Sequence, residues 1–383
     1  MDYLLTEEQK MARDMARKFA DNELKPLADR LDREHTHSPE VLKQLGEMGI
    51  MGVAVPEEYG GGGMDYISYA LIVTEISRAC GGTGTIVAAH NSLYCYPVLK
   101  FGTEEQKQRF LEPCASGRSV GCYALTEADA GSDPAAMRTT ARLDGDSWVI
   151  NGEKKFISNG NIADYCVFAA VTDRSKGYKG ISQFVCDLRE TPGFKVGRVE
   201  EKLGINASGT AELVFEDSRV PKDAILGEPG AGLRQMLETL DSGRISIASQ
   251  ALGIGRAVLE ESIEYAKTRV QFGKPIAEFQ AIQWKLADMA TQLDAAALLI
   301  WRAAWLEDHD MHFEMEAAMA KMYASDAAMQ AALEGVQILG GYGYVRDYPM
   351  ERHFRDVKIT QIYEGTNEIQ RLVISRNLLG KRG

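Results

Sequence analysis

The chain has 383 residues, more than one hydrophobic core usually holds, so two or three compact units are expected. Its formal net charge of -12 argues against a nucleic-acid-binding protein, since no block of Lys or Arg offsets that sign. Any anionic ligand must therefore meet local cations.

Neither disulfides nor a membrane span are indicated by the sequence. The six cysteines are scattered, form no CxxC pair and all lie in the first half of the chain, which is typical of reduced thiols. No run of about 18 apolar residues occurs, and the chain enters a capped helix without an apolar or Arg-rich presequence. We expect a soluble, cytoplasmic protein without membrane insertion.

Residues 1–121 are predicted to be helical. Thr6 and Gln9 form a capping-box pattern ahead of an apolar stripe. The stretches 39–48 and 67–80 also keep a helical period.

Residues 122–230 are predicted to form β structure, as a small sandwich or barrel. Residues 148–150 lead into Asn151 and Gly152, the dipeptide most typical of a hairpin turn, and residues 154–158 are expected to return. Further strands rich in β-branched and aromatic residues are predicted at 165–171, 181–188 and 211–220.

Residues 231–383 are predicted to form a four-helix bundle. Long apolar stripes without internal proline occupy 242–269, 279–308 and 313–339, and a fourth helix follows Thr366. The chain is thus an α+β multidomain protein, with a helical domain, a β domain and a helical bundle in that order.

The segment 358–372, KITQIYEGTNEIQRL, places a carboxylate just ahead of the last helix. Glu364 follows Tyr363 and precedes Gly365, and Thr366 can cap the helix. Because Gly365 has no side chain, a flat ligand can approach the backbone beside the carboxylate. This arrangement suits a catalytic base, and it fits a solvated surface turn equally well.

Other segments carry weaker signals. YALTEADAGSDPAA at 123–136 can offer backbone N–H groups and the hydroxyls of Thr126 and Ser132 to phosphates or to the edge of a heterocycle. Three patterns follow in the last part of the chain: Asp241 three residues before Arg244, TRVQFGKPI at 268–276, and QILGGYGY at 337–344. Taken singly, these three fit a salt bridge, a surface turn and a helix C-cap.

In this order and spacing, the segments resemble the acyl-CoA dehydrogenase family, most closely its short-chain (butyryl-CoA) branch. The resemblance runs from LTEEQ near the start to IYEGTNEIQRLV near the end. It implies FAD held between the β domain, the bundle and a neighbouring subunit. It also implies a homotetramer built as a dimer of dimers, and an electron-transferring flavoprotein as the partner that receives the electrons.

The resemblance implies that Glu364 removes the α-proton of an acyl-CoA thioester while the β-hydrogen leaves as hydride to FAD. The implied substrate-binding residues are Ser132, Asp241, Arg244, Tyr363 and Gly365. The implied FAD-binding residues are Tyr123, Leu125, Thr126, Gly131, Ser132, Phe156, Ile157, Ser158, Arg269, Gln271, Phe272, Phe279, Gln280, Gln337, Gly340, Gly341, Thr366, Asn367 and Glu368. Those at 269–280 and 337–341 would reach the FAD of a partner subunit, and no metal site is expected.

Several positions at which the sequence departs from family members narrow the expected base and substrate. Some family members carry the base on the bundle helix, but Gly243 occupies that position here. Gly84 stands where glutaryl-CoA enzymes carry an arginine, so a dicarboxylyl substrate is disfavoured. Phe156 and Ser158 replace the frequent Trp and Thr and keep an aromatic wall and a hydroxyl. The role of His90 stays open.

The alternatives are a dehydrogenase of a branched or cyclic acyl-CoA, an acyl-CoA oxidase or flavin monooxygenase on the same scaffold, and a helical scaffold protein that has lost flavin. The presence of a base together with both flavin motifs weakens the scaffold alternative.

Overall fold

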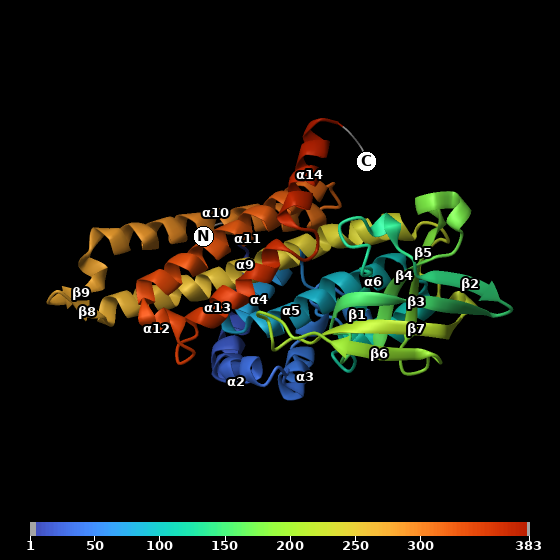
Figure 1. Cartoon of the computed structure of the whole chain (residues 1–383), viewed down its shortest axis with the longest axis horizontal. Helices are drawn as coiled ribbons and strands as arrows, with labels where there is room; N and C mark the ends of the chain where they lie inside the picture. The colour runs from blue at the N-terminus through green and yellow to red at the C-terminus, as the bar shows by residue number, and fades with distance from the viewer. Residues whose placement is uncertain (1–4, 381–383) are drawn as a thin grey trace.

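The computed structural model describes residues 5–380, in which an elongated helical bundle adjoins a β-rich part (Figure 1). One helix, α9 (Gly232–Thr268), runs through the bundle and reaches strand β5 (Ile181–Asp187) of the β part. Its 37 residues span roughly 55 Å at about 1.5 Å per residue. The two parts are therefore joined by one continuous rod.

The N-terminal part is helical, as predicted. Thr6 accepts a hydrogen bond from the Gln9 backbone and Gln9 accepts one in return, which confirms the capping box. The helices are α1 (Glu7–Phe19), α2 (Ala28–Arg33), α3 (Pro39–Glu47), α4 (Tyr66–Ala79), α5 (Gly81–Ala88), α6 (Tyr96–Phe101), α7 (Glu104–Gln106) and α8 (Glu112–Ala115). A π-helical segment, Ala89–Cys95, joins α5 to α6.

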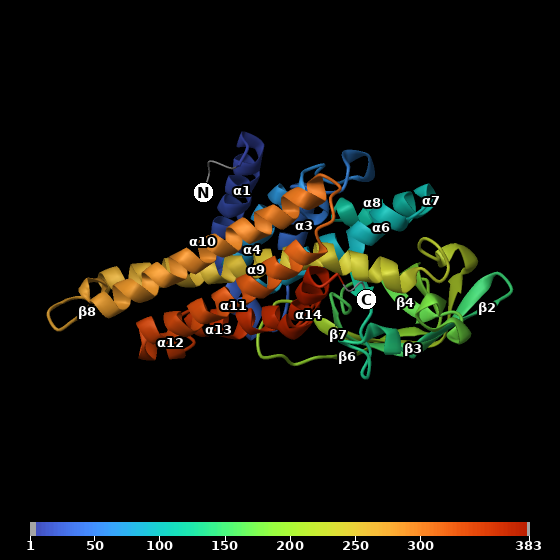
Figure 2. The same ribbon diagram turned by 90° about the horizontal axis from the view of Figure 1, so that it is seen from above.

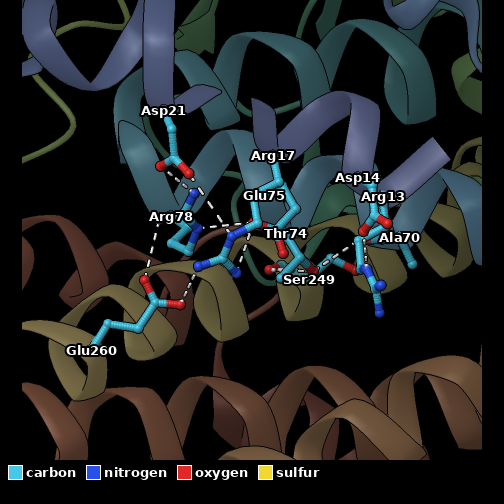
Figure 3. A network of polar contacts seen from close by, with 10 residues as sticks. All are labelled: Arg13, Asp14, Arg17, Asp21, Ala70, Thr74, Glu75, Arg78, Ser249 and Glu260. Carbon is cyan, nitrogen blue, oxygen red and sulfur yellow. Dashed lines mark hydrogen bonds and ion pairs between the residues drawn. The ribbon is translucent and has the colours of Figure 1, made fainter. Parts of the chain in front are cut away.

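A buried ion-pair cluster fixes these helices to α9 (Figure 3). The side chain of Arg78 on α4 is 2% exposed, and its guanidinium lies 2.8 Å from the carboxylate of Glu75. It also lies 2.5 Å from Asp21, beyond α1, and 3.2 Å from Glu260 on α9. A guanidinium buried without partners would cost several kcal/mol, so these acids stabilise the contact between the N-terminal helices and α9.

The middle part is a seven-stranded sheet with the order β1-β4-β2-β3-β7-β6, and β5 pairs with β4. β1 lies parallel to β4, and the pairs β2–β3, β3–β7, β4–β5 and β6–β7 are antiparallel. The strands are β1 (Gly121–Ala124), β2 (Thr140–Asp144), β3 (Ser147–Ser158), β4 (Tyr165–Val171), β5, β6 (Phe194–Val199) and β7 (Thr210–Pro221). The three strands predicted at 165–171, 181–188 and 211–220 are confirmed as β4, β5 and β7.

The hairpin predicted at Asn151 and Gly152 is wrong. β3 continues through both residues and pairs with β2 on one side and β7 on the other. The two residues instead mark a register shift against β7, where Asn151 exchanges hydrogen bonds with Asp217. The turn that does join β2 to β3 lies between Asp144 and Ser147. Pairing on both sides of the strand outweighed the local turn preference.

The C-terminal part packs α10 (Gln280–Asp308) and α11 (Glu314–Leu339) along α9 (Figure 2). Their shared core is rich in alanine, which lets the helix axes approach closely. α14 (Asn367–Leu378) contacts α11, whereas α13 (Met350–Val357), which was not predicted, lies against both α9 and α11. The remaining elements are β8 (Val270–Gln271), β9 (Lys274–Pro275) and α12 (Gly341–Tyr344).

All six cysteines are buried and unpaired. Among the described residues, no helix is both long and apolar enough to cross a membrane. In the same residues, no cluster of three or more His, Cys, Asp or Glu side chains is arranged to hold a metal ion.

Candidate active site

Glu364 lies in a tight turn between the end of α13 and the start of α14. Its φ is +53° and that of Gly365 is +89°, so two successive residues adopt the left-handed region. That region is rare for a residue with a side chain and costs of order 1–3 kcal/mol. Thr366 caps α14 by accepting a hydrogen bond from the backbone of Ile369, as the sequence predicted.

The carboxylate of Glu364 points into the protein against α9. Its Oε2 atom is buried and has no hydrogen-bond partner within residues 5–380. A Cβ atom added to Gly243 on α9 would lie 2.1 Å from that oxygen. Glycine at position 243 therefore makes room for the Glu364 carboxylate, and no second carboxylate can stand there at the same time.

Burial raises the pKa of Glu364 to about 8, and the positive charges of Lys321 and Arg244 oppose that rise. A carboxyl group with a pKa near the working pH is suited to accepting a proton. Such a perturbed group in a buried position is a candidate functional residue.

Arg244 and Asp241 form an ion pair on α9, beside the carboxylate. Burial raises the pKa of Asp241 to about 6, and the guanidinium of Arg244 opposes the rise. Arg244 is 4% exposed, and its Nε atom has no hydrogen-bond partner within the described chain. The hydroxyl of Ser242 is also buried and makes no hydrogen bond within the described chain.

Tyr363, the residue before Glu364, joins the turn to α9 through a hydrogen bond. Its hydroxyl donates to Oε1 of Gln250 on α9, two helical turns beyond Gly243. The Gln250 amide in turn donates to the hydroxyl of Thr85 at 2.7 Å and to the carbonyl oxygen of Gly81 at 2.9 Å. Tyr363, Gln250 and Thr85 thus form a hydrogen-bonded polar cluster that begins at the residue before Glu364.

The two predicted flavin segments lie side by side. The Lys155 backbone N–H donates to the carbonyl oxygen of Thr126 at 2.9 Å, which joins segment 123–132 to segment 156–158. The fully buried Lys154 ammonium donates to the carbonyl oxygen of Leu125 and to the carboxylate of Glu127. Glu127 also accepts from the backbone of residues 138 and 139, so one buried ion pair holds the first segment in shape.

This surface has groups free for a cofactor. Phe156 is 64% exposed, so an aromatic face is open for stacking. The hydroxyls of Thr126 and Ser158 make no hydrogen bond within the described residues, and a Cβ atom at Gly131 would meet nothing within 4 Å. Tyr123 and Leu125 are buried behind them, as is Ile157, while Ser132 is exposed. An exposed aromatic side chain, free hydroxyls and an open glycine fit the isoalloxazine ring and the pyrophosphate of FAD.

The second set of predicted cofactor residues lies at the opposite end of the bundle, around β8 and β9 (Figure 1). A cavity of about 490 Å³ is lined there by Arg269, Gln271, Gly340 and Gly341 together with neighbouring residues. Arg269 has no carboxylate partner among the described residues, and its guanidinium lies 5.5 Å from the ring centre of Tyr342. An unpaired cation facing a cavity suits a phosphate group.

Other predicted residues surround this end of the bundle. Phe272 is 94% exposed and packs edge-on against the half-buried Phe279. Gln280 and Gln337 are exposed. The predicted residues therefore form two groups, one around Glu364 and one at the far end of the bundle.

Asn367 and Lys321 are linked to each other. The Asn367 side chain is buried and hydrogen-bonded to Lys321, Ser325 and Asp326 on α11, and its expected place beside the cofactor stays a prediction. Glu368, the next residue, is exposed. Lys321 itself was missed, although a lysine inside the apolar run AAMAKMYA is the signal that could have revealed it.

His90 holds the helical part to the sheet. Its Nδ1 atom accepts from the Gly121 backbone at 3.0 Å, and its Nε2 atom lies 3.1 Å from the carbonyl oxygen of Cys114. Burial lowers the pKa of His90 to about 4, so the ring is neutral. The imidazole is thereby committed to structural contacts.

Comparison with known proteins agrees with this architecture. Models of the N-terminal, middle and C-terminal domains of acyl-CoA dehydrogenase match residues 6–118, 122–218 and 230–379. Together these matches cover most of the chain. The chain therefore belongs to the acyl-CoA dehydrogenase family, whose members are oxidoreductases.

Within the family, the chain is similar to short-chain enzymes. The mitochondrial short-chain specific acyl-CoA dehydrogenase of Bos taurus is 52% identical over 375 residues, 98% of this chain and 91% of the relative. The structure of butyryl-CoA dehydrogenase from Megasphaera elsdenii is 44% identical with a TM-score of 0.96, covering 99% and 100% of the two chains.

A solved chain described with the electron transferring flavoprotein of Acidaminococcus fermentans is 49% identical with a TM-score of 0.97, over 99% and 100%. The predicted fold class is confirmed. The cofactor of the protein is FAD, as in a Mycobacterium smegmatis glutaryl-CoA dehydrogenase solved with FADH2, which is 34% identical with a TM-score of 0.94, over 100% and 97%.

Proposed function

We propose that the protein oxidises a short-chain acyl-CoA to the trans-2-enoyl-CoA, with Glu364 as the acceptor of the α-proton. The observation that carries this proposal is the buried Oε2 atom of Glu364, which lacks a hydrogen-bond partner among residues 5–380 and faces Gly243. FAD supplies the hydride acceptor for the β-hydrogen.

The chain's own groups acidify and orient the substrate. The cations Lys321 and Arg244 favour the ionised form of Glu364, and the burial of its Oε2 atom limits the contact of the carboxylate with water. The free donors of Ser242 and Arg244 can hold the CoA part of the substrate. Positioned proton transfer contributes roughly 10²- to 10⁴-fold to such a reaction.

A short acyl chain is favoured by the polar side chains that follow from Tyr363, the neighbour of the base in the chain. Tyr363, Gln250 and Thr85 form a hydrogen-bonded cluster there, where a longer acyl chain would need apolar space. Inserting methylene groups would break these bonds and leave buried polar atoms unsatisfied. The similarity to short-chain relatives supports the same assignment.

The two separated groups of cofactor residues support a site shared between subunits. Since α10 alone is roughly 43 Å long, the far cavity at Arg269 cannot serve an FAD bound beside Phe156 of the same chain. A neighbouring subunit would bring the two groups together, and mutual sharing of the site calls for a closed assembly. The resemblance to the family favours a dimer of dimers. We further propose that an electron-transferring flavoprotein takes the electrons, docking near the exposed Phe156.

Glu364→Gln should keep FAD and bind substrate, and it should slow flavin bleaching by butyryl-CoA at least about a hundredfold, because only the proton acceptor is lost. Anaerobic stopped-flow absorbance measures the rate, with the surface variant Glu264→Gln as a control that keeps the parent rate. In the parent, an added electron-transferring flavoprotein should accelerate reoxidation. Bleaching of Glu364→Gln at the parent rate contradicts the assignment of the base, and peroxide release in air without such acceleration points to an oxidase.

The rate of flavin reduction should rise with pH. Glu364 accepts a proton only when ionised, and its pKa is raised to about 8 in the free protein. Below that value the apparent second-order rate should fall about tenfold per pH unit, and above it the rate should level off. A profile that stays flat between about pH 6 and about pH 9 would rule out a buried carboxyl as the controlling group.

Gln250→Ala should shift the preference toward longer acyl chains, because it removes the central member of the polar cluster that includes Tyr363. We expect kcat/KM for octanoyl-CoA relative to butyryl-CoA to increase by about tenfold or more. Ser249→Ala is the matched control, since that hydroxyl bonds within its own helix to Ile245. An unchanged ratio in Gln250→Ala would place the acyl chain elsewhere.

Arg269→Ala should weaken FAD retention, because it removes the unpaired cation from the far cavity. FAD released on gel filtration measures the effect, and light scattering reports the assembly. Lys267→Ala, which loses only an exposed pair with Glu264, is the control. Tight FAD binding by Arg269→Ala, or an FAD-loaded monomer of the parent, would refute the shared site.

A further inference from the structure

A fully buried lysine lies behind the proposed base. Lys321 on α11 is 0% exposed, and its ammonium donates to the carbonyl oxygen of Gly365 at 2.8 Å. It also donates to Oδ1 of Asn367, the first residue of α14, at 3.0 Å. Both acceptors belong to the turn that carries Glu364 and to the helix start that follows it.

No carboxylate lies within ion-pair distance of this ammonium among the described residues. The charged groups that face it are Glu364, Arg244, Asp326 and Glu368. Burying an ammonium without a direct ion pair costs several kcal/mol, which ordinary packing would avoid. A charge kept at such a cost next to a strained turn points to a role in the site.

The contacts show what the lysine holds in place. The carbonyl oxygen of Gly365 receives the Lys321 ammonium and, at 2.8 Å, the amide of Gln370. Gln370 also donates to the carbonyl oxygen of Glu364 at 3.2 Å. These bonds pin two carbonyl groups toward α11 and α14, while the Glu364 carboxylate points the other way, toward Gly243 on α9.

We propose that Lys321 is a positioning residue: it holds the left-handed turn at Glu364 and Gly365, and its charge favours the proton-accepting form of the carboxylate. The proposal rests on the proposed function of Glu364 and assigns a second role within the same site.

The electrostatic surroundings of Glu364 support this role. Burial raises the pKa of Glu364, and Lys321 is the largest favourable charge that opposes the rise, ahead of Arg244. Burial lowers the pKa of Lys321, and the negative charge of Glu364 is the largest charge that opposes this fall, so each group favours the charged form of the other. The phenols that face the carboxylate, those of Tyr69, Tyr123 and Tyr363, have pKa values raised by burial and are neutral at working pH.

Removing the charge of Lys321 should raise the pKa of Glu364. A neighbouring cation lowers the pKa of a carboxyl group. Without the charge of Lys321, the pKa of Glu364 should therefore move further up, so less of the base is ionised at neutral pH. A shift of one pH unit corresponds to about a tenfold slower reaction below the midpoint.

Three variants of the FAD-loaded protein separate charge from structure. Lys321→Gln keeps an amide donor for Gly365 and removes the charge, whereas Lys321→Arg keeps a charge. Ser325→Ala is the matched control, because it removes another contact with Asn367, at 3.2 Å, without changing any charge. The flavin absorbance spectrum of each variant checks that FAD is bound.

Two readouts are measured against pH: flavin reduction by butyryl-CoA, and the infrared band of a protonated carboxyl group that disappears in Glu364→Gln. We expect both midpoints to rise in Lys321→Gln, with about tenfold slower reduction at pH near 7, and to stay near the parent values in Lys321→Arg and Ser325→Ala. A parent midpoint in Lys321→Gln, or an equal rise in Ser325→Ala, overturns the proposal. A parent protein that butyryl-CoA does not bleach instead refutes the proposed function, and the infrared midpoints still test Lys321.

Discussion

The site depends on one buried carboxylate that has no hydrogen-bond partner of its own. Oε2 of Glu364 can stay unpaired because α9 offers a glycine at position 243 and because cations stand nearby. A residue with any side chain at 243 would push the carboxylate away, and full solvation would return the group to an ordinary weak base. The proposed role of Glu364 as a base therefore rests on the small residue at position 243 and on the missing hydrogen bonds to Oε2 within the described residues.

α9 links this carboxylate to the rest of the molecule. Its first half carries Asp241, Arg244 and Gly243 beside the β part, and its second half leads to the cavity at Arg269. The buried pairs around Arg78 fix the same helix to the N-terminal part. A helix of this length separates the two groups of predicted cofactor residues, and the proposed sharing of the site between subunits rests on that separation.

Local patterns predicted much of this arrangement. The capping box at Thr6, the strands β4, β5 and β7, the long helices and the turn before the Thr366 cap all follow from periodicity and capping residues. The assignment of Asn151 and Gly152 to a hairpin failed because pairing with β2 and β7 is decided by residues far away in sequence. Helix α13 was missed because it is short. Lys321 was missed because a lysine in an apolar stripe is usually taken as a surface position, and only the tertiary structure shows its carbonyl partners.

The buried Lys321 side chain helps to hold the strained turn at Glu364 and Gly365. Two left-handed residues in succession would relax if their carbonyl groups could turn toward other partners, and each such residue with a side chain costs of order 1–3 kcal/mol. The bonds from Lys321 and Gln370 remove that freedom. An amide alone would suffice to hold the turn, as Gln370 shows, so geometry by itself does not account for a charged group at position 321. The positive charge of Lys321 acts on the Glu364 carboxylate, whose ionised form it favours. Under our proposal, the same side chain thus holds the turn that carries Glu364 and favours the ionised form of its carboxylate.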